Sequence, residues 1–381
     1  MVLFFVVFFI VYSAVNYYIF IHGWQAIAHF PFLKPFYITI FLFAASAYII
    51  SKIVGASIPD TLYDILLWSG SFWFAFMLYF FLFIILIDLT RLFNHFFNIY
   101  PAFISANYAT TKFVAFLAVI IISTIIVIIG FINTKNIKIN YAEIDIPKKS
   151  SGMNELNLVL VADFHLTPIN NSELLKKIIE KINTLNPDIV LIPGDVLDDN
   201  INILRRRNIG KSLSKIKSKY GVFISNGNHE FINGVEEMNK YLDEMKLNVL
   251  RDSSILINKS FYVVGREDRS KIDFTGNPRK SLKEILTNVN RDYPVIMLDH
   301  TPSGLGETVN ENIELQLSGH THNGQLFPLN YITKWIYEIS WGYLKKEQTQ
   351  FYVTCGVGTW GPPVRLGSDS EIVNIKIRFV E

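Results

Sequence analysis

The stretch LNLVLVADFHL, residues 156–166, joins a continuous apolar run to a polar cluster. Uninterrupted runs of this kind are typical of strands that are buried on both faces of a sheet. PDIVLIPGD (187–195) and YGVFISNGNHE (220–230) repeat the pattern, and SELLKKIIEKINTL (172–185) has helical spacing with Ser172 available as N-cap. Strands that alternate with helices and end in polar clusters predict an α/β domain whose site lies beyond the strand ends.

Other segments from residue 137 onward extend this pattern. The sequence predicts an alternating strand at 137–146, an amphipathic helix at 235–247, a strand–turn–strand unit at 248–269, and strands within 292–300 and 313–322. No internal repeat or low-complexity linker precedes them. We therefore expect residues 136–381 to form one α/β catalytic domain.

The N-terminal part of the chain has a different composition, dominated by Phe, Ile, Leu, Val and Tyr. Four apolar stretches, at roughly 2–21, 36–57, 69–89 and 112–132, have the ~20 residues that a membrane-spanning helix needs. The first stretch lacks a basic start and a cleavage pattern, so we interpret it as a retained helix and not as a signal peptide. Residues 1–135 are expected to form an all-α bundle of four transmembrane helices.

Charge and cysteine content narrow the classes of partner. The net charge is +2 and no basic run stands out, so no nucleic acid partner is expected. The single cysteine, Cys355, excludes an intramolecular disulfide.

The lipid bilayer is an expected partner, and the protein is expected in the cell membrane as a multi-pass protein. Basic residues flank the spans on both sides, and their balance slightly favours a cytoplasmic catalytic domain.

Five polar clusters follow the predicted strands: DFH (163–165), GDVLD (194–198), GNHE (227–230), DH (299–300) and GHTH (319–322). The chain has eight histidines, and all five outside the apolar part fall in these clusters. Any one cluster alone is more often a cap, a turn or a core hydrogen bond. Together, imidazoles and carboxylates placed after successive strands are typical of a metal site.

These motifs, in this order, resemble those of the calcineurin-like metallophosphoesterases, whose blocks are D-x-H, G-D-x-x-D, G-N-H-E/D, H and G-H-x-H. The resemblance runs from about residue 140 to the end. It is strongest with a membrane-attached bacterial subgroup, through GHTHNGQ (319–325) and GVGTWGPPVRLGSDSEIVNI (356–375). The resemblance implies a sandwich of two mixed β-sheets flanked by helices. Asn323 replaces a glycine of the subgroup, and asparagine tolerates the left-handed conformation, so metal binding is expected to survive.

The resemblance also implies roles for individual residues around two divalent ions, Mn²⁺, Fe²⁺ or Zn²⁺. One ion would be held by Asp163, His165, Asp195 and His322, and the other by Asp195, Asn228, His300 and His320, with Asp195 bridging. His229 resembles the non-ligand histidine that stabilises the transition state or protonates the leaving oxygen. Asp198 and Glu230 are expected to orient ligands or His229. Arg365 is a candidate contact for a substrate phosphate, although a structural ion pair is the commoner role of a single arginine.

The combined interpretation is a membrane-bound phosphohydrolase in which metal-activated water attacks a phosphodiester or pyrophosphate. The anchor favours a lipid-linked or envelope substrate. Two alternatives stay open: a phosphodiesterase acting on soluble nucleotides, and a non-catalytic metal-binding sensor or scaffold. The aromatic segment 327–346 directly follows the second histidine pair, and it is either a lid or membrane-facing ledge, or a segment packed against the sheet.

Overall fold

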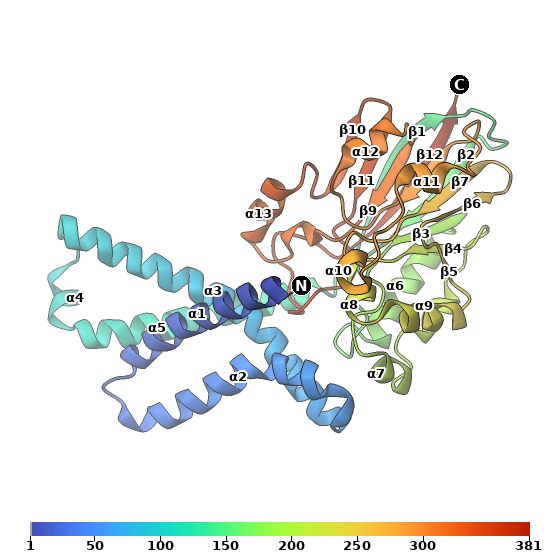
Figure 1. Ribbon diagram of the computed structural model, residues 1–381. Coiled ribbons are helices and arrows are strands. Elements are labelled where there is room, and N and C mark those ends of the chain that lie inside the picture. The colour runs from blue at the N-terminus through green and yellow to red at the C-terminus, as the bar shows by residue number, and fades with distance from the viewer. Residues whose placement is uncertain (1) are drawn as a thin grey trace. The chain divides into compact units, whose positions relative to one another are not determined.

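The computed structural model describes residues 2–381, with side chains from residue 6 onward. The chain divides into two compact units (Figure 1). The helical unit comprises residues 1–132 with 361–364, and the α/β unit comprises residues 133–360 with 365–381. The helical unit thus contains the apolar part of the sequence.

Four long helices account for most of the helical unit. They are α1 (Val2–Ala26), α2 (Lys34–Val54), α3 (Asp60–Phe97) and α5 (Tyr108–Asn133), with short helices at Pro31–Leu33 (η1), Gly55–Ser57 (η2) and Ala102–Ala106 (α4). Within the described part of the chain, four helical segments are long and apolar enough to cross a membrane, as predicted. At 38 residues α3 exceeds the predicted stretch, because the helix starts directly after Pro59 and continues through polar flanks to Phe97.

An ion pair near the C-terminal end of α3 belongs to a larger polar group. Arg91 Nη1 lies 2.9 Å from Asp88 Oδ1. From α1, the Tyr18 hydroxyl donates to Asp88 Oδ2 at 2.6 Å, and His22 Nε2 lies 3.0 Å from the same oxygen. The contact between α1 and α3 therefore contains a polar cluster of Tyr18, His22, Asp88 and Arg91.

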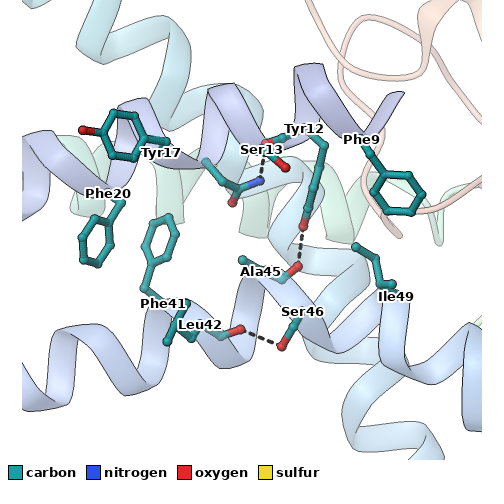
Figure 2. Close-up of a pocket in the computed structure, with 11 residues that line it drawn as sticks. Phe9, Tyr12, Ser13, Tyr17, Phe20, Phe41, Leu42, Ala45, Ser46 and Ile49 are labelled. Atoms are coloured by element: carbon teal, nitrogen blue, oxygen red, sulfur yellow. Dashed lines mark hydrogen bonds between the residues drawn. The ribbon is translucent and has the colours of Figure 1, made fainter. Parts of the chain in front are cut away.

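Between α1 and α2 lies an apolar pocket of about 410 Å³ (Figure 2). Phe9 and Tyr12 line it from α1, and Phe41 and Ile49 line it from α2. The Tyr12 hydroxyl crosses to the other helix and donates to the backbone oxygen of Ala45 at 2.6 Å. A bonded hydroxyl among aromatic and aliphatic side chains suits helices surrounded by hydrocarbon, where a polar group needs a partner inside the protein.

Two six-stranded mixed sheets form the centre of the α/β unit (Figure 1). The first has the order β1 (Lys138–Pro147), β12 (Glu371–Val380), β2 (Glu155–Leu160), β3 (Ile189–Pro193), β4 (Val222–Ser225), β5 (Asn248–Val249). The second has the order β10 (Gly342–Lys346), β11 (Thr349–Val353), β9 (Leu315–Ser318), β8 (Val295–Leu298), β7 (Phe261–Gly265), β6 (Ser253–Ile257). Strands β2 to β5 run parallel, as do β7, β8, β9 and β11.

Helices and apolar clusters complete the sandwich. The helices are α6 (Ser172–Thr184), α7 (Ile201–Arg206), η3 (Lys211–Lys215), α8 (Asn228–Ile232), α9 (Val235–Glu244), α10 (Lys271–Thr275), α11 (Leu282–Leu286), α12 (Leu305–Asn310), η4 (His322–Gly324) and α13 (Leu329–Ile336). One buried cluster joins the two sheets and includes Leu158 and Leu317. A second joins α6 and α9 to the first sheet, and a third joins α11 to the second sheet. The predicted fold, two mixed sheets flanked by helices and preceded by four long apolar helices, is confirmed.

Local details differ from the sequence prediction at two places. The N-cap of α6 is Asn171, whose side chain accepts hydrogen bonds from the backbone of Glu173 and Leu174, and Ser172 is the first helical residue. The aromatic segment 327–346 is not uniform, because its end forms strand β10 while α13 has no buried residue. The end of the segment is therefore an edge strand of the second sheet, and α13 is not buried against it.

Candidate metal centre

The predicted metal ligands lie at the carboxyl ends of parallel strands in both sheets. Asp163 follows β2, Asp195 follows β3 and Asn228 follows β4, all in the first sheet. His300 and His320 follow β8 and β9 in the second sheet. The carboxyl ends of parallel strands meet at one edge of a sheet, so the fold brings together side chains far apart in the sequence.

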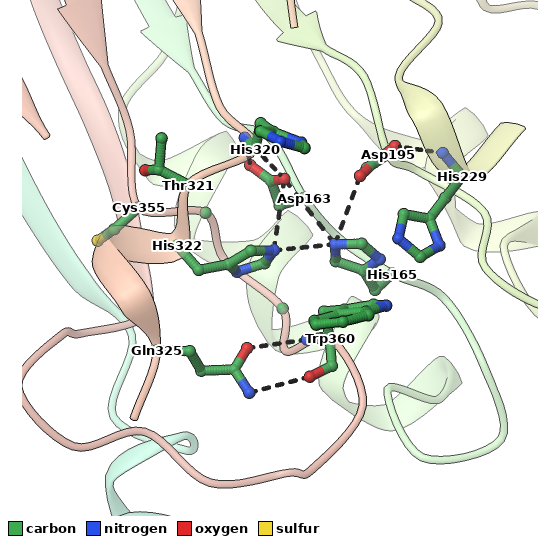
Figure 3. A network of polar contacts seen from close by, with 12 residues as sticks. Asp163, His165, Asp195, His229, His320, Thr321, His322, Gln325, Cys355 and Trp360 are labelled. Carbon is green, nitrogen blue, oxygen red and sulfur yellow. Dashed lines mark hydrogen bonds and ion pairs between the residues drawn. The ribbon is translucent and has the colours of Figure 1, made fainter. Parts of the chain in front are cut away.

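Three ligand atoms meet on one side of the centre (Figure 3). His165 Nε2 lies 3.0 Å from His322 Nε2 and 3.8 Å from Asp163 Oδ1, and His322 Nε2 lies 3.5 Å from the same oxygen. His165 Nδ1 faces Asp198 Oδ2 at 3.0 Å and donates to it, since a carboxylate only accepts. The free lone pair of His165 is therefore on Nε2, which points towards the other two ligands.

A second set meets around Asp195, His300 and His320. Asp195 Oδ2 lies 3.1 Å from His300 Nε2 and 3.7 Å from His165 Nε2, so this carboxylate stands between the two sets. Asn228 joins through its Oδ1, 3.0 Å from His320 Nδ1. The structure thus brings together all seven side chains that the sequence analysis expected to hold metal.

His300 shows directly how the donor set fits a cation. Its Nδ1 lies 2.7 Å from the backbone oxygen of Pro193 and must carry the proton, which leaves the lone pair on Nε2. That Nε2 is buried and, despite the short distance to Asp195, makes no hydrogen bond of acceptable geometry among the described residues. Burial opposes a charged imidazole, yet Asp195 and Asp163 raise the pKa of His300 well above its usual value. The carboxylates favour positive charge at this point, and a divalent cation would supply it.

The pKa values of His320, His322 and Asp163 also agree with a cation at this position. Burial, together with His300, lowers the pKa of His320 to about 4, and burial with His165 lowers that of His322 well below its usual value. Both imidazoles are therefore neutral at pH 7, as metal ligands must be. Burial raises the pKa of Asp163 to about 6, because a carboxylate held without water or a cation is destabilised.

Backbone strain is present at most of the expected ligands. Five of the expected ligands have positive φ: Asp163 (55°), His165 (41°), Asp195 (54°), His320 (70°) and His322 (48°). Such conformations cost roughly 1–3 kcal/mol each in non-glycine residues and are found mainly at functional sites. Asn323 also has positive φ, 46°, which confirms that this replacement accepts the left-handed conformation.

Two glycines of the motifs allow the loops to approach the ligand carboxylates. A Cβ at Gly319 would lie 2.3 Å from Asp163 Oδ2, and one at Gly227 would lie 2.2 Å from Asp195 Oδ1. Both distances are far below van der Waals contact. Any side chain at either glycine would displace a carboxylate of the centre.

His229 lies beside the ligands and is bonded to a carboxylate. Its Nδ1 donates to Asp198 Oδ1 at 2.5 Å, and its backbone N–H donates to Asp195 Oδ1 at 2.9 Å. Burial alone would lower the pKa of His229, but the charges of Asp198 and Asp195 outweigh it and raise the pKa to about 9. Burial likewise opposes ionisation of Asp198, and His229 with His165 holds its pKa well below the usual range. An imidazolium and a carboxylate therefore face each other next to the ligands.

Glu230 contacts backbone atoms and not the imidazoles. Its Oε1 accepts hydrogen bonds from the N–H groups of Val196 and Leu197, and its Oε2 accepts from those of Asp195 and Gly227. The sequence analysis expected Glu230 to orient ligands or His229. In the structure its carboxylate joins the loop that carries Asp195 to the loop that carries Asn228.

Arg365 does not fit the expected contact with a substrate phosphate. The side chain is fully buried, and its nitrogens donate to the backbone oxygens of Cys355, Gly356, Gly358 and Asp369 and to the Ser368 hydroxyl. Its nearest contact with the centre is His322 Nδ1, at 3.3 Å. Arg365 holds together the turn behind the second histidine of GHTH and is inaccessible to a phosphate. Asp299, next to His300, pairs with Arg279 and Arg266, also away from the ligands.

The sequence analysis missed a clamp on the 358–360 turn. Gln325 Nε2 donates to the backbone oxygen of Trp360 at 3.0 Å, and the Trp360 N–H donates to Gln325 Oε1 at 2.9 Å. Asn170 Nδ2 donates to the backbone oxygens of His165 and Thr359. The clamp places the half-exposed Trp360 ring 6.0 Å from the ring of His229 (Figure 3). Gln325 and Trp360 lie in the two stretches that carried the family resemblance, which was the only signal for them.

Known proteins are similar to this chain in the region that holds the centre. Residues 156–324 match the calcineurin-like phosphoesterase family. A Danio rerio transmembrane protein with metallophosphoesterase domain is 31% identical over 272 residues, 68% of this chain and 62% of the relative. An uncharacterized metallophosphoesterase of Campylobacter jejuni is 30% identical over 269 residues, 69% of each chain. Another from Aquifex aeolicus is 30% identical over 229 residues, 59% of this chain and 85% of the relative.

The shares of length differ among these relatives. The chain spans 62% of the Danio rerio relative and 60% of a Helicobacter pylori metallophosphoesterase. It spans more than two thirds of the Campylobacter jejuni and Aquifex aeolicus relatives at 30% identity. With these matches and the buried His/Asp clusters at the strand ends, the chain belongs to the calcineurin-like metallophosphoesterase family.

Proposed function

We propose that the protein is a membrane-bound, dinuclear metal-dependent phosphohydrolase of the membrane-attached bacterial subgroup. The observation that carries the proposal is the convergence of seven buried or half-buried ligand side chains from both sheets on one point, with Asp195 between the two sets. In this proposal residues 1–135 form the membrane anchor and residues 136–381 form the catalytic domain.

The residues present fit two divalent cations. Asp163, His165, Asp195 and His322 would hold one, and Asp195, Asn228, His300 and His320 the other. The donors are imidazole nitrogens and amide or carboxylate oxygens without a thiolate, which suits Mn²⁺, Fe²⁺ or Zn²⁺. When bound, the cations activate a water for attack on phosphorus and neutralise the phosphoryl oxygens.

The protein's own groups supply the proton and the orientation. His229 is protonated at neutral pH because of Asp198, so it can donate a proton to the leaving oxygen or stabilise charge in the transition state. Asp198 also fixes the tautomer of His165. One carboxylate therefore orients both an expected ligand and the proposed acid.

A lipid-linked or envelope phosphodiester or pyrophosphate is the proposed substrate class. Four candidate membrane spans in the same chain support it, since they would keep the catalytic domain beside the bilayer. The Danio rerio relative is also named as a transmembrane protein. We place the catalytic domain on the cytoplasmic side, in line with the distribution of basic residues near the spans.

The test uses the full chain in detergent, loaded with Mn²⁺. Two substrates are compared: a water-soluble aryl phosphodiester, and a polyprenyl-linked pyrophosphate in mixed micelles followed by mass spectrometry. We expect both to be cleaved, the lipid-linked one faster, with both activities lost in His229→Gln. If metal binds but neither substrate is cleaved, a metal-binding sensor replaces the enzyme. Faster cleavage of the soluble ester would favour a phosphodiesterase acting on soluble nucleotides.

A further inference from the structure

Helix α13 presents apolar side chains to the outside of the α/β unit. None of its residues is buried. Trp335 is 87% exposed, and four more large apolar side chains of this segment are about half exposed or more: Phe327, Tyr331, Ile332 and Ile336. Single exposed apolar residues are common on protein surfaces, but contiguous groups of this size mark an interaction site.

The spacing places these side chains on one face. Tyr331 and Trp335 are four residues apart, as are Ile332 and Ile336, so each pair lies one helical turn apart. Lys334 is exposed on the same short helix. Trp and Tyr mixed with aliphatic residues and a lysine is the composition of helices that lie in the headgroup region of a bilayer.

Chain connections link α13 to the end of the last candidate span. The last residue of α5, Asn133, donates through Nδ2 to the backbone oxygens of Arg365 and Ser368, at 3.2 and 3.3 Å. Between those two residues, Leu366 bridges to Leu326, and the N–H of Phe327 donates to the Leu366 oxygen at 2.7 Å. The segment that leads into α13 is therefore bonded to the same short turn as the residue at which the fourth span ends.

The other connections of α13 lead to the metal centre. The Thr321 hydroxyl, inside GHTH, donates to the backbone oxygen of Ser340 at 2.5 Å and closes the base of the 321–340 loop. Tyr337, at the C-terminal end of α13, has its ring 6.0 Å from the ring of His320. A substrate that reached the protein along α13 would thus arrive beside the expected ligands.

We propose that the face formed by Phe327, Tyr331, Ile332, Trp335 and Ile336 inserts into the headgroup region of the lipid bilayer, so that the catalytic centre takes its substrate from the membrane surface. The substrate part rests on the proposed phosphohydrolase function. The docking part rests on the exposed side chains of this segment and on its connections, and not on catalysis. A second copy of the chain is the competing occupant of this face.

The docking can be measured without turnover or added metal. Trp335→Cys and Ile332→Cys are prepared in the full chain, labelled with an environment-sensitive fluorophore, and reconstituted into vesicles of phosphatidylcholine and phosphatidylglycerol. Lys177→Cys on α6 provides the exposed control position. The only native cysteine, Cys355, is 2% exposed, so labelled wild-type protein gives the background. Phosphatidylcholine with a nitroxide on its acyl chain is the quencher.

We expect lipid nitroxides to quench the labels at 332 and 335 and to leave the label at 177 unchanged. Equal, weak quenching at all three positions would overturn the proposal. A second outcome would also overturn it: the label at 335 is shielded from water, is not quenched by lipid, and responds to protein density in the vesicle. A second copy of the chain would then cover the face. If quenching is seen but the wild-type protein cleaves no phosphoester, the docking stands and the phosphohydrolase function fails.

Discussion

The metal centre and α13 depart in opposite directions from the usual distribution of polar and apolar groups. The centre buries carboxylates and imidazoles almost completely: Asp163 and His300 are 0% exposed and Asp195 is 2% exposed. Helix α13 exposes Trp335 to 87%. Soluble proteins rarely bury charged groups unless these are paired, and rarely expose apolar groups in patches. In our proposals each departure is explained by a partner, a cation for the first region and lipid for the second.

The candidate spans of the helical unit also expose large apolar side chains, but α13 differs from them in length. The shortest candidate span has 21 residues, whereas α13 has 8. At 1.5 Å per residue a helix of this length covers roughly 12 Å, too little to cross a hydrocarbon core of about 30 Å. Its single exposed apolar face suits a helix that lies on the membrane.

The largest effect is expected from Asp195→Asn, which changes the buried metal centre. Asparagine keeps the size but removes the negative charge shared by the two ligand sets. Loss of hydrogen-bond partners behind a metal ligand already costs roughly 10–100-fold in metal affinity or activity, so loss of the shared carboxylate should exceed this. Isothermal titration with Mn²⁺ and hydrolysis of an aryl phosphodiester measure the two losses. Wild-type activity in this variant would exclude Asp195 from the centre.

The next largest effect is expected from His229→Gln. Removal of a general acid typically costs roughly 10²–10⁴-fold, so turnover should fall by that order while the amount of bound metal stays unchanged. His95→Gln, near the end of α3, is the matched control and should leave turnover unaltered. A variant that lost metal together with activity would indicate that His229 is a ligand, as its position in one of the His/Asp groups also allows.

On the exposed side, the double variant Trp335→Gln/Ile332→Gln should impair only the membrane reaction. Burial of a large apolar side chain contributes roughly 1.5–3 kcal/mol, so loss of either should weaken lipid contact by about tenfold or more. We expect slower cleavage of a lipid-linked substrate in vesicles and unchanged cleavage of a soluble aryl ester. Equal loss of both activities would instead indicate damage to the centre.

Asp198→Asn also removes the partner behind His165, so its specific readout is the pH dependence of the activity that remains. His229 works as an acid only below its pKa of about 9, so activity falls as the pH rises through that value, and bound cations would move the fall to lower pH. Removing the adjacent negative charge should lower the pKa by roughly 1–3 units and shift the alkaline limb the same way. A profile of kcat against pH measures the shift. An unmoved alkaline limb would remove His229 from the role of proton donor.

The smallest effect is expected from Asn323→Gly, which restores the residue typical of the subgroup. The backbone is already left-handed at φ 46°, and Asn323 Oδ1 has no hydrogen-bond partner among the described residues. Glycine relieves strain but adds freedom to the unfolded chain, so the free energy of unfolding should change by less than about 1 kcal/mol. Thermal unfolding and metal titration would both detect a larger role.

Much of the fold and the ligand set could be predicted because the signals are local. The strands β2, β3, β4 and β8 are largely apolar runs, and expected ligands follow each of them within a few residues. Strands β10, β11 and β12 were not predicted. Strand β12 shows why, because its pairing with β1 joins residues more than 200 positions apart, and no local pattern specifies that pairing.

Roles that depend on burial or on contacts between distant loops could not be predicted. Arg365 carries a charge that suggests phosphate binding, and only the structure shows that backbone oxygens enclose it. The clamp of Asn170 on Thr359 joins residues 189 positions apart. For α13 the sequence offered packing against the sheet or a lid or membrane-facing ledge, and only the structure shows that its side chains are not buried.

The most direct test of the central claim is the metal content of the full chain, purified, loaded with Mn²⁺, freed of excess ion and measured by mass spectrometry against protein concentration. We predict close to two ions per chain in the wild-type protein and a clear loss in Asp195→Asn, in which both ligand sets are incomplete. Fewer than one ion per chain, or the same content in both proteins, would contradict a dinuclear centre bridged by Asp195.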